Sequence, residues 1–524
     1  MDAEFDLVVV GAGTAGLLAA VAAHRLGERV LVVDADHLAG GSTAGSDGRI
    51  WLPANDLMTK LGVTDSVAEA ADYLEALLGP VTAASTAERR SAYVHTAGKL
   101  ARWLTQSNVA LTAVKGVPDH HSDLPGGKSQ GRVLQAQPMD RRVLGDWAGS
   151  LRPESGAETS RLGRLMPGRR NTETAGEALA GQLLHRATAN GVEVWLDSPV
   201  VALLGEDAVT GVVVHTDGAD VTVPAGRVLL ASGGFERNQS LREEYLPLPT
   251  EADWSVSGAA NTGDLLNLAV AHGAATAALD DAWWAPVMLA DSVAYSLDGV
   301  RGKPHSLIVD SAGDRFFNEA APANTAGRAL YDRSRGVRAV PSFLIMDKVH
   351  RQNVPLGPWA AGNTPKAAIE SGDVVRAGTL NDLATALGVD RAGLLGSVVR
   401  FNGFAGKGKD TDFKRGESAW DAAAGEAGKA GKRRNPSLGK VEKPPFYAVK
   451  VYPGDTGTKG GLLIDATSRV LTSNGSVLPG LYACGGVAAS LFKNASPAPG
   501  AALGAALVEA FLAATDQPER RREL

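Results

Sequence analysis

The first 34 residues carry the clearest pattern of apolar and polar positions in the chain. An unbroken apolar run at residues 7–10 is typical of a buried strand, and the Ala- and Leu-rich stretch 17–26 predicts a helix directly after it. A second apolar run, RVLVVD, ends at Asp34 and predicts another buried strand. The pattern therefore predicts a complete β-α-β unit with parallel strands.

Later stretches of the chain predict further strands and helices. Residues 192–238 predict several short strands separated by glycine turns, with a return to a buried strand that ends in ASGG. The stretch HSLIVDSAGDRFFNE predicts a hairpin around Ala312 and Gly313. Near the end of the chain, PGAALGAALVEAFLAA predicts a final helix. These elements indicate an α/β core that the chain leaves and enters again.

Glycines at G-x-G-x-x-G spacing lie between the first strand and the first helix. Gly11 allows a tight turn, Gly13 lets the backbone approach a pyrophosphate, and Gly16 lets the helix pack close to the strand. The helix N-terminus directs free N–H groups and a positive dipole toward the phosphates. Asp34, at the end of the second strand, is placed to accept both hydroxyls of an adenosine ribose. The complete unit predicts a dinucleotide site.

A second loop of small residues favours FAD over NAD as the dinucleotide. It runs from Gly40 to Gly48 and follows directly after the acidic end of the second strand. An NAD domain usually continues into another helix at this point. Here Ser42, Ser46 and the neighbouring backbone amides are placed to line the phosphates and the ring of a flavin.

These observations predict an α/β fold with a Rossmann-like FAD domain of the two-dinucleotide-binding-domain type. The pattern of the sequence changes between about Trp284 and Lys443, so a second, α+β domain is expected to be inserted into it. The predicted boundaries are 1–283 for the first part of the FAD domain, 284–444 for the inserted domain and 445–524 for the second part of the FAD domain.

Composition and charge exclude several kinds of partner and indicate where the protein works. The 524 residues are 44% hydrophobic, which is enough for a large core, and the net charge of −6 points to neither a nucleic-acid nor a membrane partner. The single cysteine, Cys484, excludes an intrachain disulfide. The N-terminus lacks the basic start of a signal peptide, so we expect a cytoplasmic protein without a membrane span.

Several motifs in order resemble the 3-ketosteroid Δ1-dehydrogenases, within the fumarate reductase-type flavoprotein superfamily. They include GGSTAGSDGRIWLPAND, PDHHSDLPGG, DDAWWAPV, GDRFFNEAAP, PGDTGTKGGLLID, GLYACGGVAAS and SPAPGAALG. The resemblance spans nearly the whole chain, and it implies that the inserted domain is a catalytic domain of the kind that caps fumarate reductases. It implies non-covalently bound FAD, no metal, a small apolar cyclic ketone as substrate and an external electron acceptor.

The family reaction implied by the resemblance removes two hydrogens beside a ring ketone. A tyrosine and a backbone N–H polarise the carbonyl oxygen, a second tyrosine takes a proton, and a hydride passes to the flavin. In this chain the tyrosine positions fall on His120, Ala323 and Ser496, while the backbone donor falls on Gly500. The sequence therefore departs from the family at its catalytic tyrosines.

Besides Ser496 and Gly500, His120 and Arg301 are candidates for the chemistry. His120 is a candidate base, and the alternative is a loop histidine in solvent, with His121 equally able to point inward. Asp298 and Arg301 resemble a proton-delivery pair of the fumarate reductases. Arg301 is alternatively a clamp for a substrate carboxylate, or one half of a surface ion pair. Trp283 and Trp284 suit an apolar ring.

The predicted catalytic residues are thus Ser496, Gly500, His120 and Arg301. The predicted cofactor-binding residues are Gly11, Gly13, Ala15, Gly16, Asp34, Gly41, Ser42, Thr43, Ser46, Asp47, Gly48, Val201, Gly233, Asn261, Asp264, Gly485, Ala501 and Leu503. The favoured function is an FAD-dependent dehydrogenase of a 3-oxosteroid or another cyclic ketone. The alternatives are a flavin-dependent ene-reductase of an acidic enone and a flavoprotein with weak activity.

Overall fold

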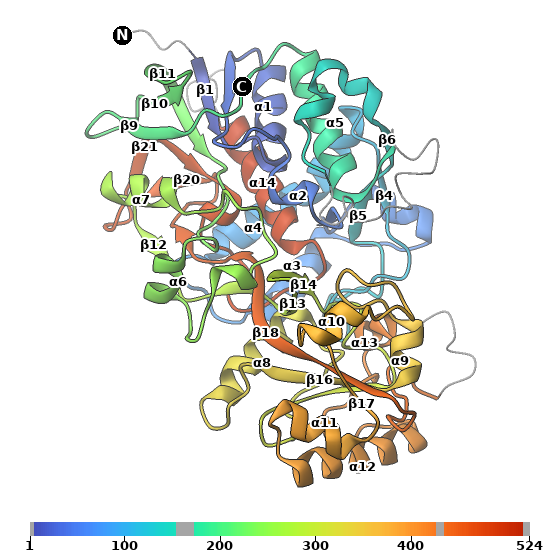
Figure 1. Cartoon of the computed structure of the whole chain (residues 1–524). Helices are drawn as coiled ribbons and strands as arrows, with labels where there is room; N and C mark the ends of the chain where they lie inside the picture. Colours follow the sequence, from blue (N-terminus) through green and yellow to red (C-terminus); the bar gives the residue numbers. More distant parts are fainter. Residues whose placement is uncertain (1–4, 154–171, 426–433, 517–524) are drawn as a thin grey trace.

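A large, mostly parallel sheet forms the upper part of the molecule (Figure 1). The computed structural model describes residues 5–153, 172–425 and 434–516. The strands of the large sheet are β1 (Phe5–Val10), β2 (Val30–Val33), β8 (Glu193–Trp195), β9 (Val200–Leu204), β10 (Gly211–Thr216), β11 (Ala219–Leu230), β20 (Arg469–Leu471) and β21 (Val477–Ala483). Smaller sheets pair β3 (Arg49–Trp51), β4 (Leu111–Ala113) and β5 (Val133–Ala136), then β6 (Met139–Asp140) with β7 (Thr172–Glu173), and β12 (Thr276–Ala277) with β19 (Gly461–Leu462).

The predicted β-α-β unit is confirmed. Strands β1 and β2 are parallel and in register from Leu7 with Val30 to Val10 with Val33. Helix α1 (Thr14–Arg25) connects them, and its apolar side chains are buried because α5 (Ala175–Ala189) and α14 (Ala501–Thr515) pack against it. The apolar runs in the sequence are therefore strands and a helix buried by neighbours on both sides.

The predicted antiparallel excursion is also confirmed. Strand β10 is antiparallel to both β9 and β11. The long strand β11 then runs on into the main sheet, where it lies parallel to β1 and to β21. One strand thus belongs to both parts, which fixes the excursion against the nucleotide fold.

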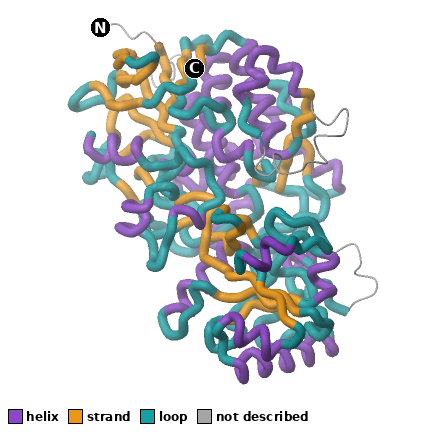
Figure 2. The backbone as a smooth tube through the Cα atoms, viewed as in Figure 1, coloured by secondary structure: helices purple, strands orange, loops and turns teal. Residues whose placement is uncertain are grey.

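A second sheet lies in the lower part of the molecule (Figure 2). Its strands are β13 (Ala282–Ala290), β14 (Val293–Ser296), β15 (Ser306–Val309), β16 (Ser342–Met346), β17 (Val375–Ala377) and β18 (Phe446–Thr458). Strand β18 pairs with β13, β16 and β17. The domain boundaries stay predictions, and from this pairing we infer that the inserted domain continues to the end of β18.

The hairpin predicted around Ala312 and Gly313 is wrong. A turn is present, but no strand follows it, and β15 pairs with β16 instead. The segment after the turn is held by ion pairs rather than by strand pairing. Arg315 donates to Glu319 at 2.7 Å and to Asp410 at 2.9 Å in the interior.

The remaining helices cover both sheets. They are α2 (Gly41–Ala44), α3 (Val67–Leu78), α4 (Ala87–Gln106), α6 (Gln239–Tyr245), α7 (Asp264–Ala271), α8 (Ala323–Ser334), α9 (Lys348–Asn353), α10 (Lys366–Glu370), α11 (Leu380–Leu387), α12 (Arg391–Lys407) and α13 (Ala419–Ala424). Among the described residues, none of the helices is both long and apolar enough to cross a bilayer.

Candidate active site

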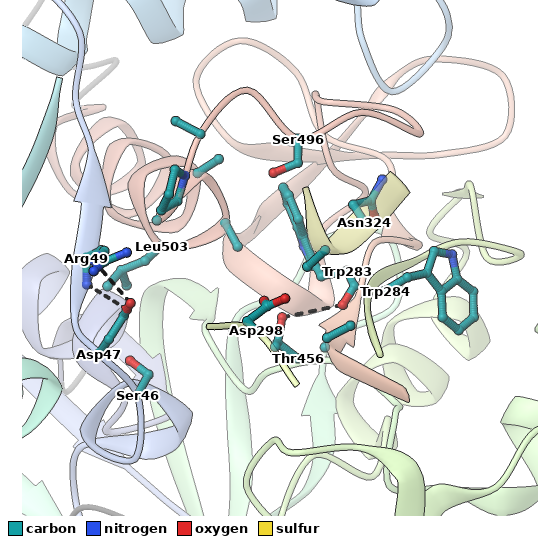
Figure 3. Close-up of a pocket in the computed structure, with 18 of the residues that line it drawn as sticks. Ser46, Asp47, Arg49, Trp283, Trp284, Asp298, Asn324, Thr456, Ser496 and Leu503 are labelled. Atoms are coloured by element: carbon teal, nitrogen blue, oxygen red, sulfur yellow. Dashed lines mark hydrogen bonds and ion pairs between the residues drawn. The ribbon is translucent and has the colours of Figure 1, made fainter. Parts of the chain in front are cut away.

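A cavity of about 730 Å³ lies between the segments that follow β11 and β21 of the large sheet and the strands β13 and β18 of the second sheet. Its walls come from the loop around α2, the first residues of β13 and α8, the end of β18, α13 and the N-terminus of α14. Figure 3 shows side chains from these separate segments facing one space, with Ser46 and Asp47 at one side and Ser496 and Trp283 at another. The cavity thus brings together residues that lie far apart in the sequence.

The N-terminus of α14 presents free backbone donors to this cavity. Gly500 precedes the helix with a φ of 80°, and a Cβ there would lie 2.4 Å from the carbonyl oxygen of Arg49. Within the described ranges, no acceptor is recorded for the N–H groups of Gly500, Ala502 and Leu503. Unpaired amides at a helix N-terminus attract an oxygen that carries negative charge.

The glycine turn has the geometry expected of a pyrophosphate site. A Cβ on Gly11 would lie 2.4 Å from the carbonyl oxygen of Ala231, and one on Gly16 would lie 2.0 Å from the oxygen of Gly11. A Cβ on Gly13 would meet only the Cα of Gly41, at 4.0 Å. The backbone is therefore packed tightly at Gly11 and Gly16 and is open at Gly13, where a phosphate has room.

The acidic end of β2 is buried beside this turn. The Asp34 carboxylate accepts hydrogen bonds from the N–H groups of Ala12 at 2.6 Å and Asp36 at 2.9 Å. Burial raises the pKa of its carboxyl, while these two hydrogen bonds oppose the rise. The carboxylate that we assign to the ribose therefore also closes the glycine turn.

The second small-residue loop contains one turn of helix, α2, and lines the cavity through Ser42, Thr43, Ser46 and Asp47. The Ser42 hydroxyl accepts hydrogen bonds from the Gly258 N–H at 3.0 Å and from Asn261 Nδ2 at 3.1 Å. The loop is thereby joined to the segment that follows β11. These contacts, with the open space at Gly13 and the free amides of α14, fit an extended dinucleotide cofactor.

The other predicted cofactor residues divide into two groups. The cavity walls include Gly233, Asn261, Gly485, Ala501 and Leu503. The remaining predicted residues lie outside the cavity walls, as far as the described residues show. They are Gly41 and Gly48, the adenosine-side residues Gly11, Gly13, Ala15, Gly16 and Asp34, and also Val201 and Asp264.

Val201 and Asp264 lie on the excursion and on the segment beyond it. Val201 is 45% exposed on β9, and Asp264, the first residue of α7, accepts a hydrogen bond from the Thr262 hydroxyl. Their roles in binding stay predictions.

Sequence reasoning missed two buried carboxylates in the cavity wall, Glu236 and Glu509. Glu236 accepts from Asn261 Nδ2 at 2.6 Å, and Glu509 accepts from the Gly485 N–H at 3.0 Å and pairs with Arg89 at 2.7 Å. Burial raises the pKa of both carboxyls. Nothing in the local sequence signals either residue, because their partners are distant in the chain.

His120 lies in the cavity wall, and the solvent-exposed alternative for it is wrong. Only 8% of its surface is exposed, and its ring stacks edge to face on Trp420 with centroids 4.3 Å apart. Its Nδ1 lies 2.9 Å from the backbone oxygen of Ser496, an acceptor, so Nδ1 carries the proton and Nε2 carries the lone pair. Burial lowers its pKa to about 3. The imidazole is therefore neutral at neutral pH.

The replaced tyrosine positions meet at the same cavity. Ser496 and Ala323 both line it, with Asn324 next to Ala323 on α8. Asn324 Nδ2 donates to the Asn494 oxygen at 2.7 Å, and its Oδ1 is buried without a recorded partner among the described residues. The cavity beside Ser496 is therefore bounded by the small side chain of Ala323 and the amide of Asn324, together with the rings of His120, Trp283 and Trp420.

Arg301 pairs with Asp298, as one of the alternatives predicted, but the prediction that this pair lies on the surface is wrong for the arginine, which is buried in the cavity wall. It is 3% exposed, its Nη2 donates to Asp298 at 2.9 Å, and its Nη1 donates to the carbonyl oxygen of Glu319 at 2.5 Å. Both terminal nitrogens already have protein partners. The arrangement favours a wall residue over a free clamp for a carboxylate.

The chain is similar in sequence to known flavin-dependent dehydrogenases. The FAD binding domain family matches residues 6–503. The chain is 34% identical over 557 residues to 3-oxosteroid 1-dehydrogenase of Mycolicibacterium smegmatis, an alignment that covers 98% of this chain and 97% of that one. It is 31% identical over 543 residues to 4-oxocyclohexanecarboxylate 2-dehydrogenase of Sinomonas cyclohexanicum, covering 97% and 92%.

A solved structure agrees with these relatives. The crystal structure of 3-ketosteroid delta1-dehydrogenase from Sterolibacterium denitrificans, in complex with 1,4-androstadiene-3,17-dione, superposes with a TM-score of 0.91 at 35% sequence identity. The superposition covers 97% of this chain and 98% of that one.

Proposed function

The chain belongs to the FAD-binding family of the 3-oxosteroid 1-dehydrogenases, and from this premise we propose that it introduces a C=C bond next to a ring ketone. The substrate is a 3-oxosteroid or a smaller cyclic ketone. One observation carries the proposal, namely that the free N–H of Gly500 and the small residues Ser496 and Ala323 border one cavity beside the expected cofactor. Bound FAD supplies the acceptor for the hydride.

Gly500 and Ser496 polarise the carbonyl oxygen in this proposal. The Gly500 N–H is unpaired within the described ranges and lies at the positive end of α14. The Ser496 hydroxyl lines the cavity, and the structure records no partner for it among the described residues. Two donors aimed at one oxygen stabilise the enolate that forms when the neighbouring carbon loses a proton. Serine reaches less far than tyrosine, so the ketone lies deeper or a water bridges the gap.

His120 is the proposed proton acceptor. Its tautomer leaves the lone pair on Nε2, and its neutral state means that the lone pair is available at neutral pH. The same burial that keeps it neutral lowers its pKa to about 3, which makes it a weak base. Because proton abstraction is faster when the base has a pKa near the working pH, we expect slow turnover.

Anaerobic flavin spectroscopy tests the proposal. The FAD-loaded protein is mixed with a saturated 3-oxosteroid and, separately, with 4-oxocyclohexanecarboxylic acid. The flavin absorbance and the formation of product are then followed together. Bleaching with formation of an α,β-unsaturated ketone is expected. The His120→Gln variant is expected to retain FAD and to bleach more slowly by roughly 100-fold or more.

Two outcomes would contradict the proposal. Reoxidation of the chemically reduced protein by an enone acid, without bleaching by either saturated ketone, would contradict the dehydrogenase direction. The absence of any response to ketone or enone would contradict catalysis of this type. The external electron acceptor and the cytoplasmic location stay predictions.

A further inference from the structure

Lys459 is a buried lysine directly behind the cavity wall. It follows the last residue of β18, within the glycine-rich sequence GTKGG, and only 1% of its surface is exposed. A lysine in such a turn normally extends into solvent. Its burial therefore calls for partners that hold an ammonium group inside the protein.

Three partners surround the Lys459 ammonium. Its Nζ donates to the backbone oxygen of Ala495 at 2.8 Å, lies 4.4 Å from the ring centroid of Trp283, and lies 3.9 Å from Asp281 Oδ2. Trp283 lines the cavity, and Ala495 immediately precedes Ser496, which also lines it. Figure 3 shows Trp283 and Ser496 on one side of that space.

We propose that Lys459 is a positioning residue whose ammonium charge holds the Trp283 ring and the segment of Ser496 in place on the substrate side of the cavity. This inference rests on the proposed function for the role of Ser496. The ammonium cation attracts the face of the indole ring, and its positive charge strengthens the hydrogen bond to the Ala495 carbonyl. One group therefore orders two wall segments that lie far apart in the sequence.

The charges that face Lys459 come from two elements. Asp281, just before β13, accepts hydrogen bonds from the Trp284 indole at 2.8 Å and from Arg328 of α8 at 2.7 Å. Burial lowers the pKa of Lys459 to about 7, the Asp281 carboxylate opposes this shift, and the Arg328 guanidinium adds to it. Lys459 is therefore charged below about pH 7 and loses its charge as the pH rises through that value.

The chain offers a matched control, Lys493. It lies two residues before Ala495 in the same segment, and its Nζ donates to the backbone oxygens of Leu78 and Pro80 at 2.8 and 2.9 Å. Both lysines thus donate to backbone carbonyls. The recorded ring contact with Trp283 belongs to Lys459.

The first experiment measures kcat and KM for a cyclic ketone between about pH 6 and 9 in K459M, K459R and K493M. In the wild-type protein and in K493M, KM is expected to rise as the pH passes about 7. In K459M, KM is expected to be raised roughly tenfold and to be independent of pH, with FAD content unchanged. In K459R, whose guanidinium stays charged, the low KM is expected to return without the alkaline rise. A K459M variant with the wild-type KM and alkaline rise would overturn the proposal.

The second experiment needs no turnover, so it separates a failure of this proposal from a failure of the proposed function. The emission of Trp283 is obtained as the difference between wild-type protein and W283F, and it is followed with pH. A change with a midpoint near pH 7 is expected in the wild-type background and not in K459M, because the cation over the ring is lost. A Trp283 emission that stays constant through this range would overturn the proposal, whatever the substrate proves to be.

Discussion

Substitution of the glycines at the start of α1 separates cofactor binding from folding. At Gly13 the φ angle is −68°, and an added Cβ meets only the Gly41 Cα at 4.0 Å. Gly13→Ala is therefore expected to leave the fold intact and to place a methyl group where the pyrophosphate binds. At Gly16 an added Cβ would lie 2.0 Å from the Gly11 oxygen, so Gly16→Ala is expected to destabilise the fold itself.

The magnitudes follow from these contacts. A methyl group at Gly13 that displaces one charge-assisted hydrogen bond of the pyrophosphate costs about 1.5–3 kcal/mol, or roughly 10- to 100-fold in FAD affinity. Overpacking at Gly16 costs about 1–3 kcal/mol of folding free energy. Gly378→Ala is the control, because an added Cβ at Gly378 meets nothing within 4 Å and its φ angle lies outside the left-handed region.

The assay is a titration of each apoprotein with FAD, followed by flavin fluorescence, alongside thermal unfolding of the apoprotein. Gly13→Ala should lower FAD affinity at an unchanged melting temperature, and Gly16→Ala should lower the melting temperature. Wild-type FAD affinity in Gly13→Ala would refute the assignment of the pyrophosphate to this turn.

The remaining predictions concern the catalytic side and the interior charge. Ser496→Ala should lower turnover by roughly 10-fold or more with FAD binding intact, as the loss of a carbonyl donor requires, and steady-state kinetics at saturating ketone checks this. Tyrosine placed together at Ala323 and Ser496 should raise the rate on a 3-oxosteroid, by up to about 100-fold or more for each restored group, in the same assay. Glu319→Gln should destabilise the fold by about 3–5 kcal/mol, because it leaves Arg315 and Arg415 buried without their shared carboxylate, and denaturant unfolding measures the loss. Although burial raises it, the pKa of Glu319 is lowered to about 2 by these arginines, so its stabilisation should be complete above pH 4.5 and fall as the pH drops toward 2, a dependence that Glu319→Gln should remove.

The cofactor half of the protein could be predicted from sequence because its signals are local. The strand, glycine turn and helix at residues 7–26 follow one another without interruption, and each glycine has a steric role that the structure bears out at Gly11 and Gly16. The sequence also predicts the return of the chain to the same sheet, because the apolar run at the end of β11 is the part that pairs with β1.

The rest depended on partners distant in the chain. The segment after β15 has the composition of a hairpin, yet Arg315 and Glu319 join a buried charge cluster with Asp410 instead of a ladder. Lys459 lies in a glycine turn that is typical of the surface, and only Ala495 and Trp283 explain its burial. The sequence pattern places such residues on an element but does not identify the side chains packed against it.

The site residues differ in the same way. The motifs identify His120 and Arg301 as candidates, but they do not predict that either side chain is buried. The partner that covers His120 is Trp420, and the partners of Arg301 are Asp298 and Glu319. The catalytic roles of Ser496 and His120 stay predictions.

We propose that this flavoprotein takes two hydrogens from a saturated ring carbon pair beside a ketone. Anaerobic stopped-flow mixing of the FAD-loaded protein with a saturated cyclic ketone, deuterated at the carbon that loses the hydride, tests it most directly. The oxidised flavin is expected to bleach at a rate slowed by the deuterium, with the α,β-unsaturated ketone formed in equal amount. A flavin that stays oxidised with saturated ketones of both the steroid and the single-ring class would contradict it.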